Sequence, residues 1–454
     1  MQLQHLYDRA PVCLQQLMCS LKGWLIRRRR YGRGFYEALH RYEHHDIQPD
    51  RRLLHFLGSL RFVPAYKQTV ESPKFRELYN ALTQSGVADL HGGVKELLGL
   101  FPVIGKNEVK QHLTDYINTA YAGPVIRMHT SGTTGGGLSF PYSVEMENEQ
   151  WAVWWRFRRS LGIDLTTWCG WLGGRVIISP QDRRRPWWRT NRPGRQVMFS
   201  LYHLTPATVA DYHGEIRRRA LTWLHGYPSS ITRLASLITE AKLPPLECVS
   251  VITTGAENLY EHQQAQIRRA FPQAIVRTHY GLAEGVANIS QDIHGQWHID
   301  SDFAHVEFLP VDPAAPSLCR IVGTGMANSA FPLVRYDTGD IARVRWHDGQ
   351  PEVLSIDGRS DDYITLPNGA RLNTGLDYIL KDSIHVHEAQ LCQKSLHAFE
   401  FRIVRRNGYS ETDEQHIRQA FHQRLGEQVS LTFSYVSEIQ KTKAGKFKMF
   451  VSEL

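Results

Sequence analysis

Cysteine is scarce in this sequence. Its 454 residues include six cysteines, and no two of them form a C-x-x-C pair. The six are Cys13, Cys19, Cys169, Cys248, Cys319 and Cys392. Such scattered cysteines exclude a disulfide framework and a cysteine-rich zinc module. We therefore expect the protein to work in a reducing compartment, the cytoplasm.

Long apolar runs are also missing. The longest near the N-terminus, residues 11–26, is interrupted by glutamines, a serine, a lysine and a glycine, which excludes a membrane span. Arg27–Arg30 follow this run, whereas a signal peptide carries its positive charge before the apolar segment. Two interpretations stay open: a basic amphipathic helix that rests on anionic lipid, or an ordinary first helix with a solvated end. We favour the ordinary helix.

The composition is that of a folded protein, with 42% hydrophobic and 22% charged residues. At about 150 residues per domain the length predicts two or three domains. The 53 Lys and Arg against 45 Asp and Glu give a net charge of +8, which favours an anionic partner. Nucleic acid is not the partner we favour, because the sequence has neither zinc-finger spacing nor an RNA-recognition aromatic motif.

The pattern along the chain predicts an α/β protein. Residues 1–120 have helical periodicity, and from about 125 short β-branched runs alternate with helices, for example at 175–179, 248–254 and 274–278. From about 300 the pattern is β-rich. We expect a helical part over 1–120, a nucleotide- and acid-binding core over 121–360 and a small α+β C-terminal domain over 361–454.

A glycine-rich loop carries the sharpest local signal. It reads Thr130-Ser-Gly-Thr-Thr-Gly-Gly-Gly137. Its glycines let the backbone approach a ligand closely, and its hydroxyls add donors without bulk. Such a loop suits phosphate oxygens. It is not a Walker A sequence, because no G-K-[S/T] closes it, and a plain turn is the alternative.

Two further turns combine glycine with glutamate. Thr253-Thr-Gly-Ala-Glu257 and His279-Tyr-Gly-Leu-Ala-Glu284 each follow an apolar run. In open α/β sheets, ligands bind outside the carboxyl ends of the strands. The two turns are therefore consistent with a shared crevice, although each alone could be a turn with a solvated carboxylate.

Three more segments carry charged residues next to glycine. They are Leu333-Val-Arg-Tyr-Asp-Thr-Gly-Asp340, Asp357-Gly-Arg-Ser-Asp-Asp362 and Gln440-Lys-Thr-Lys-Ala-Gly-Lys446. The first could aim one carboxylate at a diol, and the second lies at the junction with the small C-terminal part. A lysine beside glycine in a loop is by itself most often surface charge.

In order, these segments resemble the motifs of the adenylate-forming superfamily of acyl-CoA synthetases, luciferases and peptide-synthetase adenylation domains. The sequence is most similar to the phenylacetate–CoA ligase family, and within it to a branch labelled capsular polysaccharide biosynthesis proteins. Leu201-Tyr-His-Leu204, Leu224-His-Gly-Tyr-Pro-Ser-Ser230 and Asp361-Asp-Tyr-Ile-Thr-Leu-Pro-Asn-Gly-Ala-Arg371 point to that branch. The resemblance spans about residue 50 to the C-terminus.

The resemblance implies an ATP-dependent, AMP-forming ligase of a small carboxylic acid, with Mg²⁺ as cofactor and coenzyme A as the expected thiol acceptor. Its site residues would have distinct roles. Thr130, Ser131, Gly132, Thr133, Thr134 and Gly135 would hold the phosphates; Gly255, Ala256, Glu257, Tyr280 and Gly281 would line the adenine; Asp340 and Arg359 would meet the ribose; Glu284 would bind Mg²⁺; Asp361 would be the hinge; and Lys446 would bridge the carboxylate and the α-phosphate.

Two departures from the family pattern bear on this assignment. Ala283 stands where many relatives have Thr or Ser, so one hydroxyl donor to phosphate is missing. Asp377 stands near a position where many relatives carry glutamate, on the segment that faces the acceptor. An amide-forming ligase that acts on an amine or amino sugar is therefore the alternative.

Two aromatic segments lie outside these motifs. Trp151, Trp154 and Trp155 follow helical spacing, so we expect a stripe that faces the core. Residues 183–189, RRRPWWR, lack periodicity, so we expect an exposed loop that either holds an anion or is merely solvated.

Overall fold

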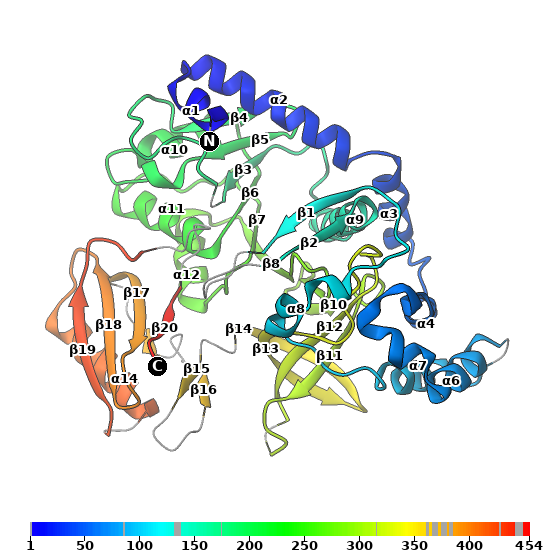
Figure 1. Ribbon diagram of the computed structural model, residues 1–454. Coiled ribbons are helices and arrows are strands. Elements are labelled where there is room, and N and C mark those ends of the chain that lie inside the picture. The colour runs from blue at the N-terminus through cyan, green and yellow to red at the C-terminus, as the bar shows by residue number, and fades with distance from the viewer. Residues whose placement is uncertain are drawn as a thin grey trace. The chain divides into compact units, whose positions relative to one another are not determined.

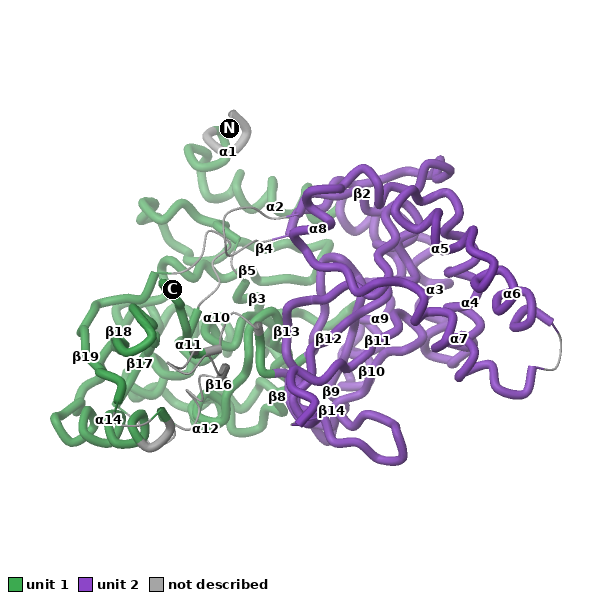
Figure 2. Tube along the Cα trace, turned by 60° about the horizontal axis from the view of Figure 1, so that its bottom comes forward, with its two compact units in different colours: residues 1–24, 165–278, 357–454 green, residues 25–164, 279–356 purple. Residues whose placement is uncertain are grey.

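The computed structural model describes residues 2–84, 87–130, 138–173, 175–314, 316–359, 363–365, 371–373, 379–380, 385–425, 428–440 and 448–454 (Figure 1). The chain divides into two compact units (Figure 2). Unit 1 comprises residues 1–24, 165–278 and 357–454, and unit 2 comprises residues 25–164 and 279–356.

The centre of unit 1 is a mostly parallel sheet with the strand order β7-β6-β3-β5-β4. Its strands are β3 (Cys169–Leu172), β4 (Trp188–Asn191), β5 (Gln196–Phe199), β6 (Trp223–Gly226) and β7 (Val251–Gly255). β3, β5, β6 and β7 run parallel, and β4 pairs antiparallel with β5. All five residues of β7 are buried, as expected for a strand covered on both faces. Beside β7, β8 (Ile275–Gly281) begins with a hydrogen bond from Ile275 N to Ser250 O.

Helices follow these strands in the chain, as the sequence pattern predicts. Unit 1 contains α1 (Gln2–Arg9), most of α2 (Val12–Arg30), the short 3₁₀ helix η4 (Leu201–His203), α10 (Val209–Arg218), α11 (Pro228–Glu240) and α12 (Glu261–Ala270). Ile231, Leu234 and Ile238 of α11 pack into one apolar core with Leu224 of β6 and Ile252 of β7. Alternation of strand and helix with a parallel sheet is the layered arrangement expected from residue 125 onward.

The C-terminal part of unit 1 is a small α+β layer. Its elements are β15 (Tyr363–Thr365), β16 (Arg371–Asn373), β17 (Val386–Gln393), β18 (Ala398–Arg405), α14 (Glu411–Leu425), β19 (Ser430–Tyr435) and β20 (Phe450–Ser452). The strand order is β19-β18-β17-β20. Leu391 and Phe401 of the sheet pack with Phe421 of α14 in a separate core. A helix packed on a sheet agrees with the α+β character expected for this part of the chain.

Unit 2 begins with helices. They are α3 (Arg33–Glu43), α4 (Pro49–Ser59), η1 (Leu60–Phe62), η2 (Pro64–Tyr66), α5 (Lys67–Glu71), α6 (Pro73–Thr83), α7 (Leu90–Leu98), α8 (Lys106–Gln111), η3 (Leu113–Tyr116) and α9 (Val144–Ser160). Before Val125, where β1 starts, the elements of the described residues are all helices or 3₁₀ turns. In α9, Trp155 is buried, and Trp151 and Trp154 are half-buried.

The strands of unit 2 form hairpins. They are β1 (Val125–His129), β2 (Ser139–Ser143), β9 (Asn288–Gln291), β10 (Trp297–Ile299), β11 (Ala304–Pro310), β12 (Leu318–Gly325), β13 (Tyr336–His347) and β14 (Gln350–Arg359). β11 to β14 are neighbours in one antiparallel sheet, drawn in yellow in Figure 1. Asp348 and Gly349 connect β13 to β14 with positive φ values of 49° and 77°, the conformation that makes Asp-Gly a favoured two-residue hairpin turn. The α/β fold class is confirmed.

Two local predictions were wrong. Residues 175–179 form no strand; Ile177 and Ile178 are buried in a bend, and Ile177 O accepts a hydrogen bond from Tyr7 Oη at 2.7 Å. The β-branched residues there reflect burial and not strand pairing. The 183–189 segment is not an exposed loop throughout. Only Arg183–Arg185 are exposed, whereas Trp187 is buried and Arg189, in β4, is fully buried.

Candidate active site

Tyr280 and Asp340 are joined by a hydrogen bond in unit 2. Tyr280 lies at the end of β8, where it pairs with Ile289 of β9, and its Oη donates to Asp340 Oδ2 at 2.7 Å. Burial first, and then the charge of Asp340, raise the pKa of Tyr280 well above its ordinary value. The phenol therefore stays protonated and keeps donating to the carboxylate.

Asp340 occupies an inward position of β13. The alternating burial along this strand places Tyr336, Thr338 and Asp340 on the same face. Asp340 is 8% exposed, and its backbone N donates to Thr338 Oγ1 at 3.1 Å. The other aspartate of the motif, Asp337, is instead paired with Arg320 at 2.6 Å. Of the two, Asp340 is the carboxylate that remains in contact with the aromatic motif of β8.

Glu284 lies in the turn that follows β8 and is 8% exposed. The hydroxyl of Tyr336 lies 3.5 Å from Glu284 Oε1, at the long limit of a hydrogen bond. Gly285 has a positive φ of 68°, and a Cβ there would lie 1.8 Å from Met146 Cε of α9. The positive φ favours glycine at this position, and the Met146 side chain of α9 packs directly against the turn that carries Glu284.

Gln150 of α9 is a polar residue that sequence reasoning missed. Its Oε1 lies 3.7 Å from the point that a Cβ on Gly285 would occupy, and the residue is 2% exposed. Among the residues that the structure describes, neither its Nε2 nor its Oε1 has a hydrogen-bond partner. Tyr336, four residues before Asp340 in β13, was also missed.

Thr130 closes the base of the glycine-rich segment. β1 and β2 pair antiparallel up to His129 and Ser139. Beyond them, Thr130 N donates to Leu138 O and Leu138 N donates to Thr130 Oγ1, both at 2.9 Å. Ser131, Gly132, Thr133, Thr134 and Gly135 lie outside the described residues.

Gly255, Ala256 and Glu257 belong to unit 1. Gly255 is buried at the end of β7, and Ala256 is exposed with a φ of 65°. Glu257 Oε2 accepts a hydrogen bond from Ser229 N at 3.2 Å, in the first turn of α11. An anionic side chain is stabilised there by the unpaired amides and the dipole of the helix.

The remaining predicted site residues lie at strand ends or outside the described residues. Arg359 is the last residue of β14. Asp361 and Lys446 both lie outside the described residues. Gly281 ends β8, where a Cβ would lie 2.9 Å from Asn288 Oδ1. The structure thus joins Tyr280 to Asp340 and brings Glu284 near Tyr336 in unit 2.

A single buried carboxylate fits Mg²⁺ chemistry. Over the described residues, no group of three or more His, Cys, Asp or Glu side chains gathers to hold a metal ion. Mg²⁺ is commonly bound through one or two carboxylates together with water and substrate phosphates. Glu284 is compatible with that mode, since most ligands would come from a nucleotide.

The fold has solved counterparts. A crystal structure of 2-hydroxyisobutyryl-CoA ligase in the postadenylation state, in complex with R3-HIB-AMP, matches with a TM-score of 0.63 over 89% of both chains at 15% identity. A structure of an anthranilate CoA ligase in complex with anthranoyl-AMP matches with a TM-score of 0.52 over 80% of this chain and 70% of the other, at 14% identity. The chain has the fold of the adenylate-forming ligases.

Sequence comparison finds one curated relative and one matching family model. Residues 366–453 match the family model described as the CapK C-terminal domain. Protein CapK of Staphylococcus aureus is 23% identical over 465 aligned positions, which cover 100% of both chains. Within the described residues, no helix is both long enough and apolar enough to cross a bilayer.

Proposed function

We propose that the protein is an ATP-dependent ligase that activates a small carboxylic acid as its acyl-adenylate and transfers the acyl group to a thiol, with coenzyme A as the acceptor. The observation that carries this proposal is the Tyr280–Asp340 hydrogen bond beside the buried Glu284 turn. This arrangement lies on a fold shared over 89% of the chain with a ligase that binds an acyl-AMP.

In the first half-reaction, a carboxylate oxygen attacks the α-phosphorus of ATP. The new O–P bond forms as the bond to the departing pyrophosphate breaks, and negative charge gathers on the phosphate oxygens. No general base is needed, because a carboxylic acid is already ionised near pH 7. The catalytic demand is electrostatic, so donors and cations that are held in place supply most of the rate.

Each polar residue then has a task. Asp340 accepts hydrogen bonds from the ribose hydroxyls, while Tyr280 holds its carboxylate and lies against the adenine with Gly255–Glu257. The segment from Thr130 to Gly135 contacts the phosphates through backbone N–H groups and hydroxyls, and Lys446 offsets charge between the carboxylate and the α-phosphate. Arg359 assists at the ribose.

Glu284 would hold Mg²⁺ through its carboxylate; the hydroxyl of Tyr336, 3.5 Å away, is too far to hold that carboxylate firmly. When bound, the ion neutralises charge on the phosphate oxygens. Gln150, which is buried beside the same turn, would donate to a ligand oxygen through its Nε2.

In the second half-reaction, a thiolate sulfur attacks the acyl carbon and AMP leaves. We propose that residues 361–454 pivot at Asp361 between the two steps, as the resemblance to the superfamily implies. An amine acceptor is the second candidate, because Asp377 stands near a position where many members of the resembled family carry glutamate, on the segment that faces the acceptor.

The experiment is ATP–pyrophosphate exchange across a panel of aryl, amino and uronic acids. With a working acid, Lys446→Ala should lose about a hundredfold to a thousandfold of the exchange rate, since it removes one preorganised charge. Lys448→Ala, two residues away, serves as the control and should exchange at the parental rate. Supplied with synthetic acyl-adenylate, Lys446→Ala should still transfer to coenzyme A, or to an amine if the alternative holds. Parental exchange by Lys446→Ala would contradict the proposed mechanism.

A further inference from the structure

Helix α2 presents apolar side chains to solvent. Five large residues on its outer surface are between 43% and 63% exposed: Leu14, Leu17, Leu21, Trp24 and Leu25. At 100° per residue they cover an arc of about 100°, which we call the outer face of α2. Single exposed leucines are common on protein surfaces, but a continuous helical stripe is not.

The opposite face of α2 is turned toward the protein. Val12, Cys19 and Ile26 lie half-buried on it, but its hydrogen bonds come from glutamine and serine, so we call it the polar face. Gln15 is 1% exposed, and its Oε1 accepts hydrogen bonds from Arg189 Nε at 2.7 Å and Nη2 at 2.5 Å. Gln16 Oε1 accepts from Thr190 N at 2.7 Å, and Ser20 Oγ donates to Thr190 O at 3.0 Å. α2 is therefore anchored to β4 by hydrogen bonds.

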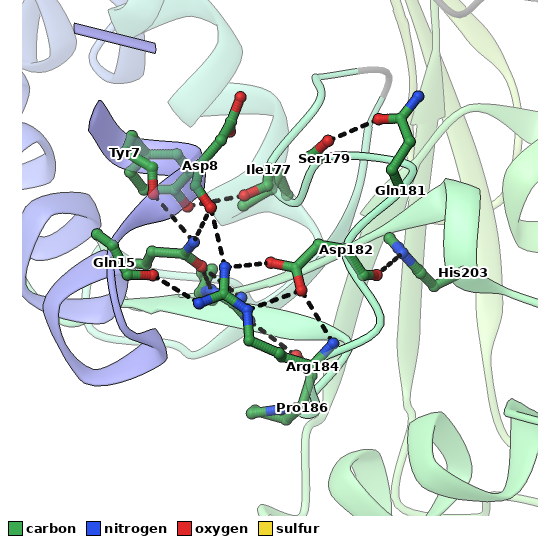
Figure 3. Close-up of polar contacts among 12 residues, drawn as sticks. Tyr7, Asp8, Gln15, Ile177, Ser179, Gln181, Asp182, Arg184, Pro186 and His203 are labelled. Atoms are coloured by element: carbon green, nitrogen blue, oxygen red, sulfur yellow. Dashed lines mark hydrogen bonds and ion pairs between the residues drawn. The ribbon is translucent and has the colours of Figure 1, made fainter. Parts of the chain in front are cut away.

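Neighbouring contacts support this anchor (Figure 3). Gln15 Nε2 donates to Tyr7 O at 3.0 Å, and Tyr7 Oη donates to Ile177 O at 2.7 Å. Arg184 reaches the carbonyls of Asp8 and Ala10, both at 2.9 Å. The polar face of α2 is consequently held against the protein by a network that also fixes α1.

The leucines and the tryptophan of the outer face of α2 point to solvent, which is unusual for a surface helix. A surface helix normally turns its apolar stripe to the core and its polar face to solvent. In α2 the polar face is used for anchoring, so the exposed apolar area stays in contact with water unless something else covers it. Anchoring of the polar face thus displays the apolar face outward.

The charges along α2 indicate which kind of partner covers its outer face. Residues 11–30 contain no Asp or Glu, whereas Lys22 and Arg27–Arg30 are basic. Arg28 is exposed and lies on the same arc as Leu14 and Leu21, at the helix end. Arg29 and Arg30 lie 2.7 and 3.6 Å from Glu147. A second copy of α2 would bring like charge to the exposed Lys22 and Arg28, whereas an anionic lipid surface attracts both residues and also takes up the leucines.

We propose that the outer face of α2 binds anionic membrane, with the helix lying in the headgroup layer. Leu17 and Leu21 enter the acyl boundary, Trp24 sits at the interface where its ring is amphipathic, and Arg28 contacts lipid phosphate. This placement does not depend on the ligase activity. It would hold the enzyme at the membrane surface.

Vesicle flotation with the full chain tests this proposal. Vesicles of phosphatidylcholine with 30% phosphatidylglycerol should bind the protein, and pure phosphatidylcholine should bind it at least about tenfold less. Leu17→Gln/Leu21→Gln should reduce binding to the anionic vesicles at least tenfold, and Arg28→Gln about fivefold. Leu396→Gln, the same change at an exposed leucine of the C-terminal part, is the matched control and should bind as the parent does.

Two results would overturn the proposal. One is equal vesicle binding by the parent and by both α2 variants. The other is a dimer in solution that Leu17→Gln/Leu21→Gln dissolves while the parent ignores vesicles, which would assign the outer face to a second copy of the chain.

Discussion

Two of the regions that bury charge in this molecule treat it differently. In unit 1, the guanidinium of Arg189 is fully buried, and its donors are taken up by Gln15 Oε1 and by the carbonyls of Pro186 and Trp188. In unit 2, the carboxylates of Glu284 and Asp340 are buried beside tyrosine hydroxyls.

This difference distinguishes a buried charge that stabilises the fold from buried charges that are available to a ligand. Burial lowers the pKa of Arg189 from its ordinary value, and this cost is offset by neutral acceptors that hold α1 and α2 in place. A tyrosine hydroxyl, by contrast, orients a carboxylate without adding positive charge to it. Asp340 and Glu284 therefore keep negative charge for ribose hydroxyls and for a metal ion, whereas Arg189 is a structural residue.

The largest effect is expected at Glu284. Glu284→Gln keeps the shape of the side chain but removes the anionic ligand, so ATP–pyrophosphate exchange should fall about a hundredfold or more, and added Mg²⁺ should recover part of the loss. Glu352→Gln, at an exposed glutamate of β14, is the control and should exchange normally. Normal turnover of Glu284→Gln at limiting Mg²⁺ would make the metal assignment wrong.

A smaller effect, on stability and not on catalysis, is expected at Gln15. Gln15→Leu leaves Arg189 Nε and Nη2 without their side-chain acceptor, so the free energy of unfolding should fall by about 2–3 kcal/mol, the cost of losing hydrogen bonds to a buried charge. Urea denaturation measures this change. The exchange rate per folded molecule should stay parental.

Gln16→Leu is the matched control for this change. Gln16 accepts from the neutral backbone N of Thr190, so its loss should cost only about 1 kcal/mol. Equal losses of stability for the two variants would show that the charge of Arg189 does not matter to the anchor.

Local chemistry made much of the fold predictable. The Asp348-Gly349 turn, the helix at 411–425 and the helical part before residue 120 each follow from residues that are neighbours in sequence. The same holds for the position of Tyr280 at the end of a strand, because a β-branched run precedes it. These features depend on backbone preference and periodicity over a few residues.

Features that depend on distant residues could not be predicted in this way. Arg189 lies in a run that looks solvated, and it is buried because Gln15, 174 positions earlier, accepts its hydrogen bonds. The proximity of Tyr336 to Glu284 joins positions 52 apart. The outward stripe of α2 was visible in the sequence, but its direction depends on the partners of its polar face.

The smallest effect is expected at Tyr280. Tyr280→Phe removes the hydroxyl that donates to Asp340 while it preserves the ring, so the ribose-binding carboxylate loses its orientation but keeps its charge. Because Asp340 would contact the ribose both before and during phosphoryl attack, the loss should appear as a KM for ATP raised about tenfold with kcat nearly unchanged. Steady-state exchange at varied ATP separates the two constants. Tyr336→Phe is the matched control, since its hydroxyl is 3.5 Å from Glu284 and contributes little at that distance, so it should change either constant by no more than about twofold. An unchanged KM for ATP in both Tyr280→Phe and Asp340→Asn would mean that this buried carboxylate is structural, and the contrast with Arg189 would disappear.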